Sequence, residues 1–329
     1  MKFCLNADCC RRKENRPIPL LPDGKLPFKT DCSRFAVCFT RRLWYILQRR
    51  TIDSLTNGQM MKLIRNSRYT KIKNAVGRAI ADYDLIKEGD RIAVGVSGGK
   101  DSYTLLHILE DLRRRAPIKY ELLAITIDSG YPGYRSDIIE NHLRDNGFAC
   151  HVERAGHFDI ITEKRRPGSS YCSICARLKR GSLYTLARKF GCNKLALGHH
   201  LDDFIETLLL NQFFVGSLKA MAPSMLADNG ATTVIRPLVY VEEEEIIPFA
   251  RENSFPVVCC CCPVCGTADL QRKKMKQLLT ELQQSIPHVK RSLLRALANV
   301  QPRHLLDRRL QTSAEPSSAV QSPPADAQP

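Results

Sequence analysis

Along the middle of the chain, two patterns of apolar and polar residues alternate. Mostly apolar runs of five or six residues occur at 91–96, 122–127, 149–153 and 194–198. Each is followed by a longer segment with apolar residues three and four positions apart, at 102–114, 136–146, 177–190 and 203–213. Short apolar runs are typical of buried strands, and the three-four spacing is typical of helices that cover a sheet. Their alternation predicts an α/β fold with a doubly wound, Rossmann-like parallel sheet.

Weaker patterns flank this core. A helix at 72–85 leads into the first strand, and residues 221–231 have the composition of a loop. A short charged helix is predicted at 242–252. The segment 268–297 is largely helical in pattern, carries Lys and Arg along its length and breaks at Pro287. We therefore expect a helical extension after the sheet.

The two ends of the chain have different compositions. Residues 1–50 show no sustained periodicity except at 35–47, a predicted short amphipathic helix around Trp44. After Arg309 the chain is rich in Ser, Pro, Ala and Gln and has no aromatic residue, which predicts disorder. No stretch is apolar enough to span a membrane, and no apolar signal region opens the chain. We therefore expect a cytoplasmic protein.

The positive charge is concentrated near the N-terminus. The net charge is +16, and residues 1–75 hold 17 Lys and Arg against 5 Asp and Glu. A basic arm beside a nearly neutral domain favours a polyanionic partner, first of all nucleic acid. A solvated tail or an anionic membrane surface would also account for the charge. The 14 cysteines, without an export signal, indicate thiols or metal ligands and not a disulfide framework.

The string SGGKDS at 97–102 lies between the first predicted strand and the helix that follows it. Glycines allow backbone N–H groups to approach an anion, and the N-terminus of the next helix attracts negative charge. The spacing fits neither the Walker A loop nor the G-x-G-x-x-G fingerprint. The six residues match the pyrophosphate loop of ATP pyrophosphatases, and an ordinary strand-to-helix turn is the alternative.

Acidic residues follow the second and fourth predicted strands. Asp128 ends the second strand, where the sugar or base of a nucleotide would lie, although it could simply terminate the strand. The string GHHLDD at 198–203 ends the fourth strand and places Asp202 and Asp203 at a helix N-terminus. Adjacent carboxylates beside a triphosphate suit Mg²⁺. Helix capping by Asp202, or a zinc site that also uses His199 and His200, is the alternative.

Two C-x-x-C pairs lie more than 80 residues apart. The first is Cys172 and Cys175, and the second is Cys262 and Cys265, directly after Cys259, Cys260 and Cys261. Four thiolates at these spacings could hold zinc or an iron–sulfur cluster, and spacing alone does not choose between them. Reduced thiols or a redox pair are further alternatives.

Five motifs occur together in one order. They are SGGKDSYTLL at 97–106, CSICARLKRG at 172–181, GHHLDDFIETLLLN at 198–211, VIRPL at 234–238, and PVCG at 263–266 followed by LQR at 270–272. Over about 69–306 the chain resembles the tRNA 2-thiocytidine synthetases of the PP-loop ATP pyrophosphatase superfamily. The match divides the chain into a basic, cysteine-containing extension at 1–68, the PP-loop domain at 69–306 and a Ser/Pro-rich tail at 307–329.

The resemblance implies an ATP-dependent tRNA sulfurtransferase that converts the cytidine at position 32 of the anticodon loop into 2-thiocytidine. It implies a homodimer, ATP, Mg²⁺, tRNA as substrate, a cysteine desulfurase as sulfur source and a [4Fe-4S] cluster held by three cysteines. Matching positions give Cys172, Cys175 and Cys262 as the cluster ligands, with Cys261 or Cys265 as alternatives to Cys262. Lys100 and Asp101 are the expected catalytic residues together with Cys172 and Cys175. The expected nucleotide and Mg²⁺ contacts are Ser97, Gly98, Gly99, Lys100, Asp101, Ser102, Asp128, Gly198, His199, Asp202 and Asp203.

Three other functions compete with this one. The 2-thiouridine branch of the superfamily carries paired zinc-binding cysteines at both ends, which this N-terminus lacks. The tRNA-lysidine synthetases share the loop but need no cysteine cluster. A zinc-stapled, non-catalytic RNA-binding protein would not need an intact loop, and Ser97, Lys100, Asp101 and Ser102 are all present.

Overall fold

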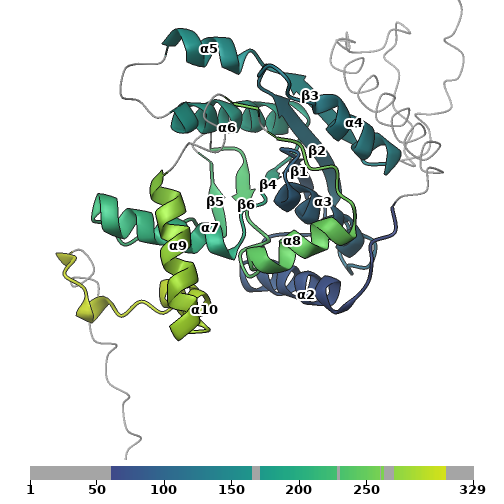
Figure 1. Ribbon diagram of the computed structural model, residues 1–329. Helices are drawn as coiled ribbons and strands as arrows, with labels where there is room; N and C mark the ends of the chain where they lie inside the picture. The colour runs from purple at the N-terminus through teal and green to yellow at the C-terminus, as the bar shows by residue number, and fades with distance from the viewer. Residues whose placement is uncertain (1–60, 165–170, 228–229, 260, 263–269, 309–329) are drawn as a thin grey trace, which may run out of the picture. The chain divides into compact units, whose positions relative to one another are not determined.

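The computed structural model describes residues 61–164, 171–227, 230–259, 261–262 and 270–308 (Figure 1). The helix predicted at 35–47 and the tail after 308 lie outside these residues. None of the helices in the described ranges is both long enough and apolar enough to cross a membrane.

A six-stranded sheet in the order β3-β2-β1-β4-β6-β5 forms the centre of the domain (Figure 1). Its strands are β1 (Arg91–Gly95), β2 (Glu121–Asp128), β3 (Cys150–Arg154), β4 (Lys194–Ala196), β5 (Ser224–Leu226) and β6 (Thr233–Ile235). All neighbouring strands are parallel except β5 and β6, which are antiparallel. The sheet winds outward in both directions from the β1–β4 pair, and ligands bind at such a switch point beyond the carboxyl ends of the strands.

Helices cover both faces of the sheet. The side chains of β1 are therefore buried on both faces, alternately on one and on the other. Ile92 and Val94 belong to the larger core cluster, under α3 (Lys100–Arg113), together with Leu105 and Ile139. Ala93 faces the smaller cluster on the opposite face. That cluster includes side chains from α6 (Tyr171–Lys189). The three-layer arrangement confirms the predicted doubly wound fold.

Further helices complete both layers. They are α2 (Ser67–Asp82), α4 (Ser136–Asp145), α5 (His157–Lys164), α7 (Leu201–Leu210), α8 (Glu243–Glu252), α9 (Leu270–Ser285) and α10 (Val289–Ala298). The side chain of Asn66 caps α2 by accepting a hydrogen bond from the backbone N–H of Tyr69 at 2.9 Å. The break at Pro287 separates α9 from α10, as the sequence predicts.

Several predicted boundaries were wrong. Helix α6 begins at Tyr171 and not at 177, because Tyr171 and Ile174 pack against Tyr131 and Ile161 and extend the helix. Residues 221–231 are not only a loop, since β5 pairs there with β6. Helix α2 begins five residues before the predicted 72, at its Asn66 cap. Helix α7 ends at Leu210, and the π-helical turn that follows it, Asn211–Val215, extends beyond the predicted 203–213 segment.

Candidate active site

The loop between β1 and α3 packs closely against the protein and requires glycine at one position. Gly98 has φ +81°, and a Cβ there would lie 2.7 Å from Cδ1 of Ile139, so only glycine fits. The Ser102 hydroxyl donates to the carbonyl of Gly99 at 2.8 Å. Helix α3 starts after Gly99 without a side-chain cap, so its first N–H groups can bind an anion.

Lys100 is held between two carboxylates at the start of α3. Its Nζ lies 3.1 Å from Asp101 and 3.0 Å from Oε1 of Glu243 at the N-terminal end of α8. Burial alone would lower the pKa of Lys100, but Asp101 and Glu243 raise it, so the side chain stays an ammonium group. The second oxygen of Glu243 lies 2.5 Å from Nζ of Lys276 on α9. A chain of charges therefore links the loop to the C-terminal helices.

The turn after β4 approaches the loop closely. A Cβ on Gly198 would lie 3.1 Å from both the carbonyl carbon of Asp101 and the backbone nitrogen of Ser102. Glycine at 198 therefore keeps the β4–α7 turn against the first turn of α3. His200, which is buried, follows and lies 3.7 Å from Oδ1 of Asp101. The predicted residues of this turn and of the loop are thus brought together.

The adjacent carboxylates of α7 have different surroundings. Asp202 is buried: one oxygen lies 2.7 Å from Nζ of Lys290, and the other accepts the backbone N–H of Glu243 at 2.7 Å. Burial alone would raise the pKa of Asp202, but its bonds to His200 and Lys290 lower it strongly. Asp203 is more exposed, accepts the backbone N–H of His200 at 3.0 Å and faces Arg272 at 3.3 Å. Asp203 is thus the more accessible of the two.

Asp128 supports the turn that follows β2. Its two oxygens accept hydrogen bonds from the backbone N–H of Gly130 at 3.0 Å and from the hydroxyl of Ser136 at 2.6 Å. Ser136 is the first residue of α4. Asp128 therefore has a structural function, and its predicted contact with a nucleotide stays a prediction.

The two predicted cysteine segments meet at one aromatic cluster. Tyr131, Ile161 and Tyr171 are buried there, and Cys175 and Cys262 pack against them. The hydroxyl of Tyr131 donates to Sγ of Cys175 at 3.2 Å. Cys261 packs against the same cluster and has φ +49°, a conformation that is rare outside glycine. The side chain of Cys172 and all of Cys265 lie outside the described part of the chain.

A backbone hydrogen bond joins the cysteine segment to the loop. The N–H of Val258 donates to the carbonyl of Gly98 at 2.9 Å, one residue before Cys259. On the other side, the hydroxyl of Tyr134 donates to the carbonyl of Ser97 at 3.3 Å. Tyr134 also packs against the cluster around Tyr131. The cysteines and the loop therefore belong to one continuous site.

Among the side chains that the structure describes, no three His, Cys, Asp or Glu groups come together as a metal site. The side chains of His199, His200, Asp202 and Asp203 are all described and do not converge in this way, so the alternative zinc site gains no support. The three-cysteine cluster includes Cys172, whose side chain is not described, so that ligand set stays a prediction.

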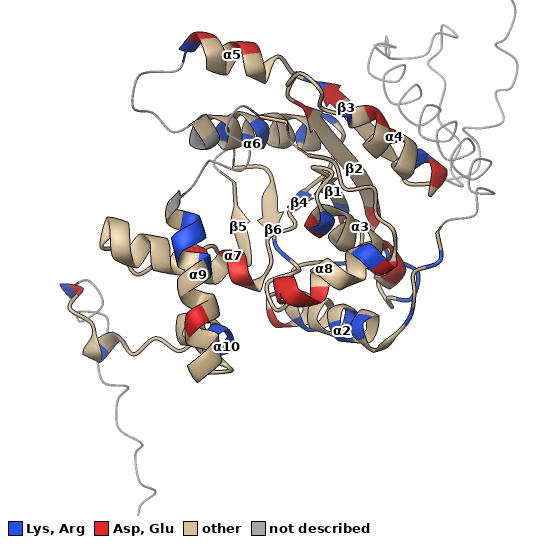
Figure 2. Cartoon of the chain, viewed as in Figure 1, with Lys and Arg blue, Asp and Glu red and all other residues tan. Residues whose placement is uncertain are grey.

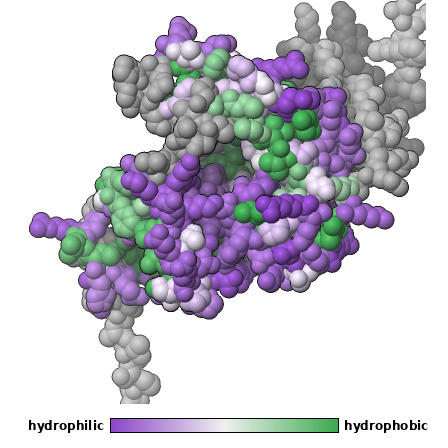
Figure 3. Space-filling view, viewed as in Figure 1, coloured by the Kyte–Doolittle hydropathy of each residue, from purple (hydrophilic) through white to green (hydrophobic). Residues whose placement is uncertain are grey.

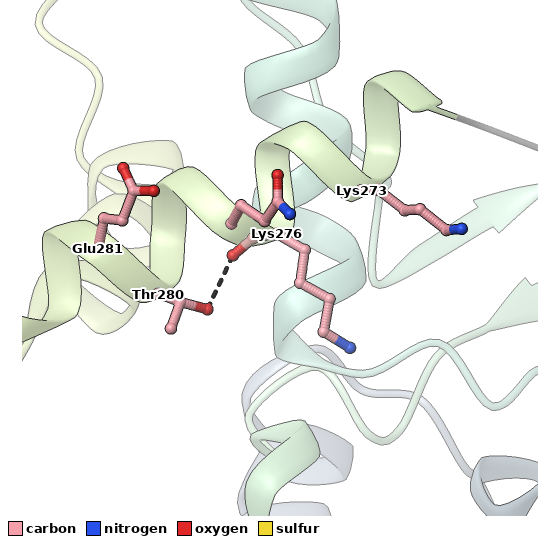
Figure 4. A pocket seen from close by; sticks show the side chains of 5 residues that line it. Lys273, Lys276, Thr280 and Glu281 are labelled. Carbon is pink, nitrogen blue, oxygen red and sulfur yellow. Dashed lines mark hydrogen bonds between the residues drawn. The ribbon is translucent and has the colours of Figure 1, made fainter.

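Basic helices lie on either side of the site. Figure 2 shows Lys and Arg along α6 and at the N-terminal end of α9, and Figure 3 shows the face hollowed between these helices. Lys273 and Lys276 line a surface pocket on α9 and extend from one side of the helix (Figure 4). Thr280 donates to the carbonyl of Lys276 there at 2.9 Å. This arrangement suits a polyanion that reaches the loop from outside.

The sequence did not reveal the residues that support the site from other elements. Glu243 contacts Lys100, and Lys290 contacts Asp202. Tyr131 contacts Cys175. Each is far in sequence from its partner, and none belongs to a recognisable motif. Arg272 is an exception, because it belongs to the LQR motif that the sequence singles out. It contacts Asp203 and also Glu206, the latter at 3.2 Å.

The class of protein follows from this loop and fold. Residues 64–258 match the model of a family described as a PP-loop domain. A relative from Geobacter metallireducens, named tRNA-cytidine(32) 2-sulfurtransferase, is 79% identical over 255 residues, which cover 78% of this chain and 99% of the relative. A relative of the same name from Geobacter sulfurreducens is 80% identical over 251 residues, which cover 76% and 98%. The chain belongs to the tRNA-cytidine(32) 2-sulfurtransferase family of PP-loop proteins.

A solved structure is similar in fold. The U34-tRNA thiolase NcsA from Methanococcus maripaludis, solved with its [4Fe-4S] cluster, matches with a TM-score of 0.58 and 22% identity. The match covers 70% of this chain and 78% of that one. These comparisons confirm the family and the fold that the five motifs predicted. The individual ligand and catalytic residues stay predictions.

Proposed function

We propose that this chain is an ATP-dependent sulfurtransferase that replaces the C2 oxygen of cytidine 32 in tRNA with sulfur. The family supports the reaction, and one observation supports the mechanism most directly. The hydrogen bond from Val258 to Gly98 places a cysteine segment next to the phosphate-binding loop. Adenylation and sulfur transfer need adjacent sites, because the activated cytidine must meet sulfur before water reaches it.

The first step activates a poor leaving group. The C2 oxygen of cytosine attacks the α-phosphorus of ATP, the bond to the β-phosphate oxygen breaks, and pyrophosphate leaves. The loop amides and the ammonium group of Lys100 stabilise the negative charge that develops on the phosphates. We assign Asp203 to Mg²⁺, because it is more exposed than the buried Asp202, with Asp101 beside it: both carboxylates lie within 3.7 Å of Nε2 of His200. Asp202 then has a structural function.

The cysteines act in the second step, the transfer of sulfur. We assign Cys172, Cys175 and Cys262 to a [4Fe-4S] cluster, which would supply an open coordination position for the sulfur that replaces AMP. The donor set fits, because Cys175 and Cys262 pack against one aromatic cluster and soft thiolates suit iron–sulfur chemistry. Tyr131 donates to Sγ of Cys175 and orients that thiolate. Cys261 and Cys265 are the alternatives to Cys262.

The tRNA substrate suggests functions for other parts of the chain. We assign the basic extension at 1–68 and the Lys- and Arg-rich faces of α6 and α9 to tRNA binding. The Ser/Pro-rich tail at 307–329 is dispensable for the reaction. A cysteine desulfurase supplies the sulfur, the enzyme is a homodimer, and it acts in the cytoplasm, where mature tRNA is found. The catalytic unit is the PP-loop domain at 69–306.

Nucleoside analysis tests this function. Transfer RNA from cells with and without the gene would be digested, and its modified nucleosides measured by mass spectrometry. Loss of 2-thiocytidine alone, restored by the intact gene, is the expected result. Persistence of 2-thiocytidine with loss of 2-thiouridine or lysidine would retain the adenylation chemistry and reject the cytidine assignment. No change in any nucleoside would reject the tRNA substrate.

A further inference from the structure

A buried arginine at the carboxyl end of β6 has no acidic partner in the part of the chain that the structure describes. Arg236 is 8% exposed. One terminal nitrogen donates to the carbonyl of Ala222 at 2.6 Å, and the other lies 3.9 Å from the sulfur of Met225, a weak acceptor. Its Nε is buried and has no hydrogen-bond partner within the described ranges. Among the described residues, no ion pair forms with this guanidinium.

Such an arginine is costly unless something else compensates the charge. Burial lowers the pKa of Arg236, and the nearby charge of Arg180 on α6 lowers it further, against the effect of Tyr184. A buried, unpaired cation loses hydration without regaining it from a carboxylate. Two hydrogen bonds to the 222–225 segment satisfy only part of the guanidinium, which carries five N–H donors. The position therefore suits an anion that arrives with a substrate.

The neighbouring strand contributes a second unsatisfied group. His199 follows the carboxyl end of β4, the strand that pairs with β6, and its Nδ1 is buried without a partner among the side chains that are described. Burial lowers the pKa of His199 to about 4; the charge of Asp203 acts against this shift, and the charge of Arg236 adds to it. His199 is thus a neutral imidazole at pH 7, able to donate one hydrogen bond. Arg180 and Arg236 are close enough to act on each other, and Arg236 and Asp203 both act on His199, so cationic and neutral donors gather at this edge of the sheet.

We infer that Arg236, with His199 and Arg180, binds a phosphate group of a substrate beside the PP loop. This inference rests on the proposed function, which brings both ATP and RNA to this edge of the sheet. A guanidinium presents paired donors that match phosphate oxygens. Strand β6 is two places from β1, roughly 10 Å at the spacing of paired strands. This separation favours a phosphodiester next to the modified cytidine over the phosphates of ATP on the loop.

Equilibrium binding separates the two sources of phosphate. The full-length protein and its Arg236→Gln variant would be titrated with unmodified tRNA and, separately, with a non-hydrolysable ATP analogue. Arg251→Gln, at an exposed position near the end of α8, is the matched control. We expect Arg236→Gln to weaken tRNA binding about tenfold, the loss of one charge-assisted hydrogen bond, and to leave analogue binding unchanged. A tenfold loss for the analogue alone would assign the same site to an ATP phosphate.

An anticodon stem-loop RNA can identify the phosphate. A neutral methylphosphonate would replace one phosphate at a time on either side of the target cytidine. At the correct phosphate, the losses caused by the methylphosphonate and by Arg236→Gln should not add, because both remove the same contact. Unchanged binding of both ligands, with only a lower melting temperature, would overturn the inference and leave Arg236 a structural link to 222–225. These measurements need no thiolation, so they stand even if the nucleoside analysis rejects the proposed function.

Discussion

The PP loop and the cysteine site differ in how the chain builds them. The loop is six consecutive residues on one strand-to-helix turn, and the large buried core directly beneath it includes Val94, Leu105 and Ile139. The cysteine site joins Cys175 on α6 to Cys261 and Cys262, which are more than 80 positions away from it, through a small cluster around Tyr131. Local structures form with little loss of chain entropy, whereas distant segments must be held by specific contacts. The loop should therefore tolerate changes in the cysteine site better than the reverse.

Separate loss of the two half-reactions is the largest effect that this comparison predicts. Cys175→Ser should abolish 2-thiocytidine formation and still release pyrophosphate in the presence of tRNA, because the loop and Lys100 are intact. Asp101→Asn should reduce pyrophosphate release at least 100-fold, the range for loss of one preorganised electrostatic contact, and thiolation with it. Purified protein, radiolabelled ATP and nucleoside analysis measure both steps.

A solvent-facing thiol provides the control for this pair. Cys259→Ser changes an exposed cysteine in the same segment and should retain both activities. Loss of pyrophosphate release in Cys175→Ser, with normal circular dichroism, would mean that the two regions are not separable. Retained thiolation in Cys175→Ser would remove Cys175 from the mechanism.

The sequence predicted the PP loop, which is one continuous segment, better than the cysteine site, which is assembled from distant segments. SGGKDS predicted the loop and the start of α3 within two residues, because its glycines and the apolar strand before them are local features of the sequence. The early start of α6 escaped prediction, since Tyr171 and Ile174 pack in the same cluster as Tyr131, which is 40 or more positions away in the sequence. The strand β5 was missed because three exposed residues carry no alternation. Glu243 and Lys290 could not be assigned, because single charged residues on helices are ordinary surface features.

Gly198 tests how much the loop depends on its neighbouring strand. In Gly198→Ala the new Cβ meets the backbone of Asp101 and Ser102 at 3.1 Å, so the first turn of α3 must move by a few tenths of an ångström. We expect kcat/KM for ATP to fall about tenfold, since misplacement by a whole ångström costs about 100-fold. The control is Gly77→Ala in α2, where a Cβ meets nothing within 4 Å. That change should retain activity and raise the free energy of unfolding by about 1 kcal/mol. Equal kinetics for the two variants would show that the Gly198 contact is not needed.

The smallest predicted effect concerns the core beneath the loop. His107 on α3 is 3% exposed, stacks on Phe255 with ring centroids 4.8 Å apart, and lies 3.0 Å from Nε2 of His142. Burial, and then the charge of His142, lowers the pKa of His107 to about 3. The unfolded chain, with a histidine pKa near 6.5, therefore takes up a proton first as the pH falls, and stability is lost from about pH 6.5 downward.

This linkage can be measured by urea denaturation at several pH values. Between pH 7.5 and 5.5 the free energy of unfolding should fall by about 1 kcal/mol on account of His107 alone. His107→Phe keeps an aromatic ring against Phe255 but cannot be protonated, so its stability should fall less over the same range. A matching change at an exposed site, His304→Phe, should leave the slope unchanged. If His107→Phe and the parent chain lose equal free energy of unfolding over this range, protonation of His107 is not the cause. The acid sensitivity then arises from other residues.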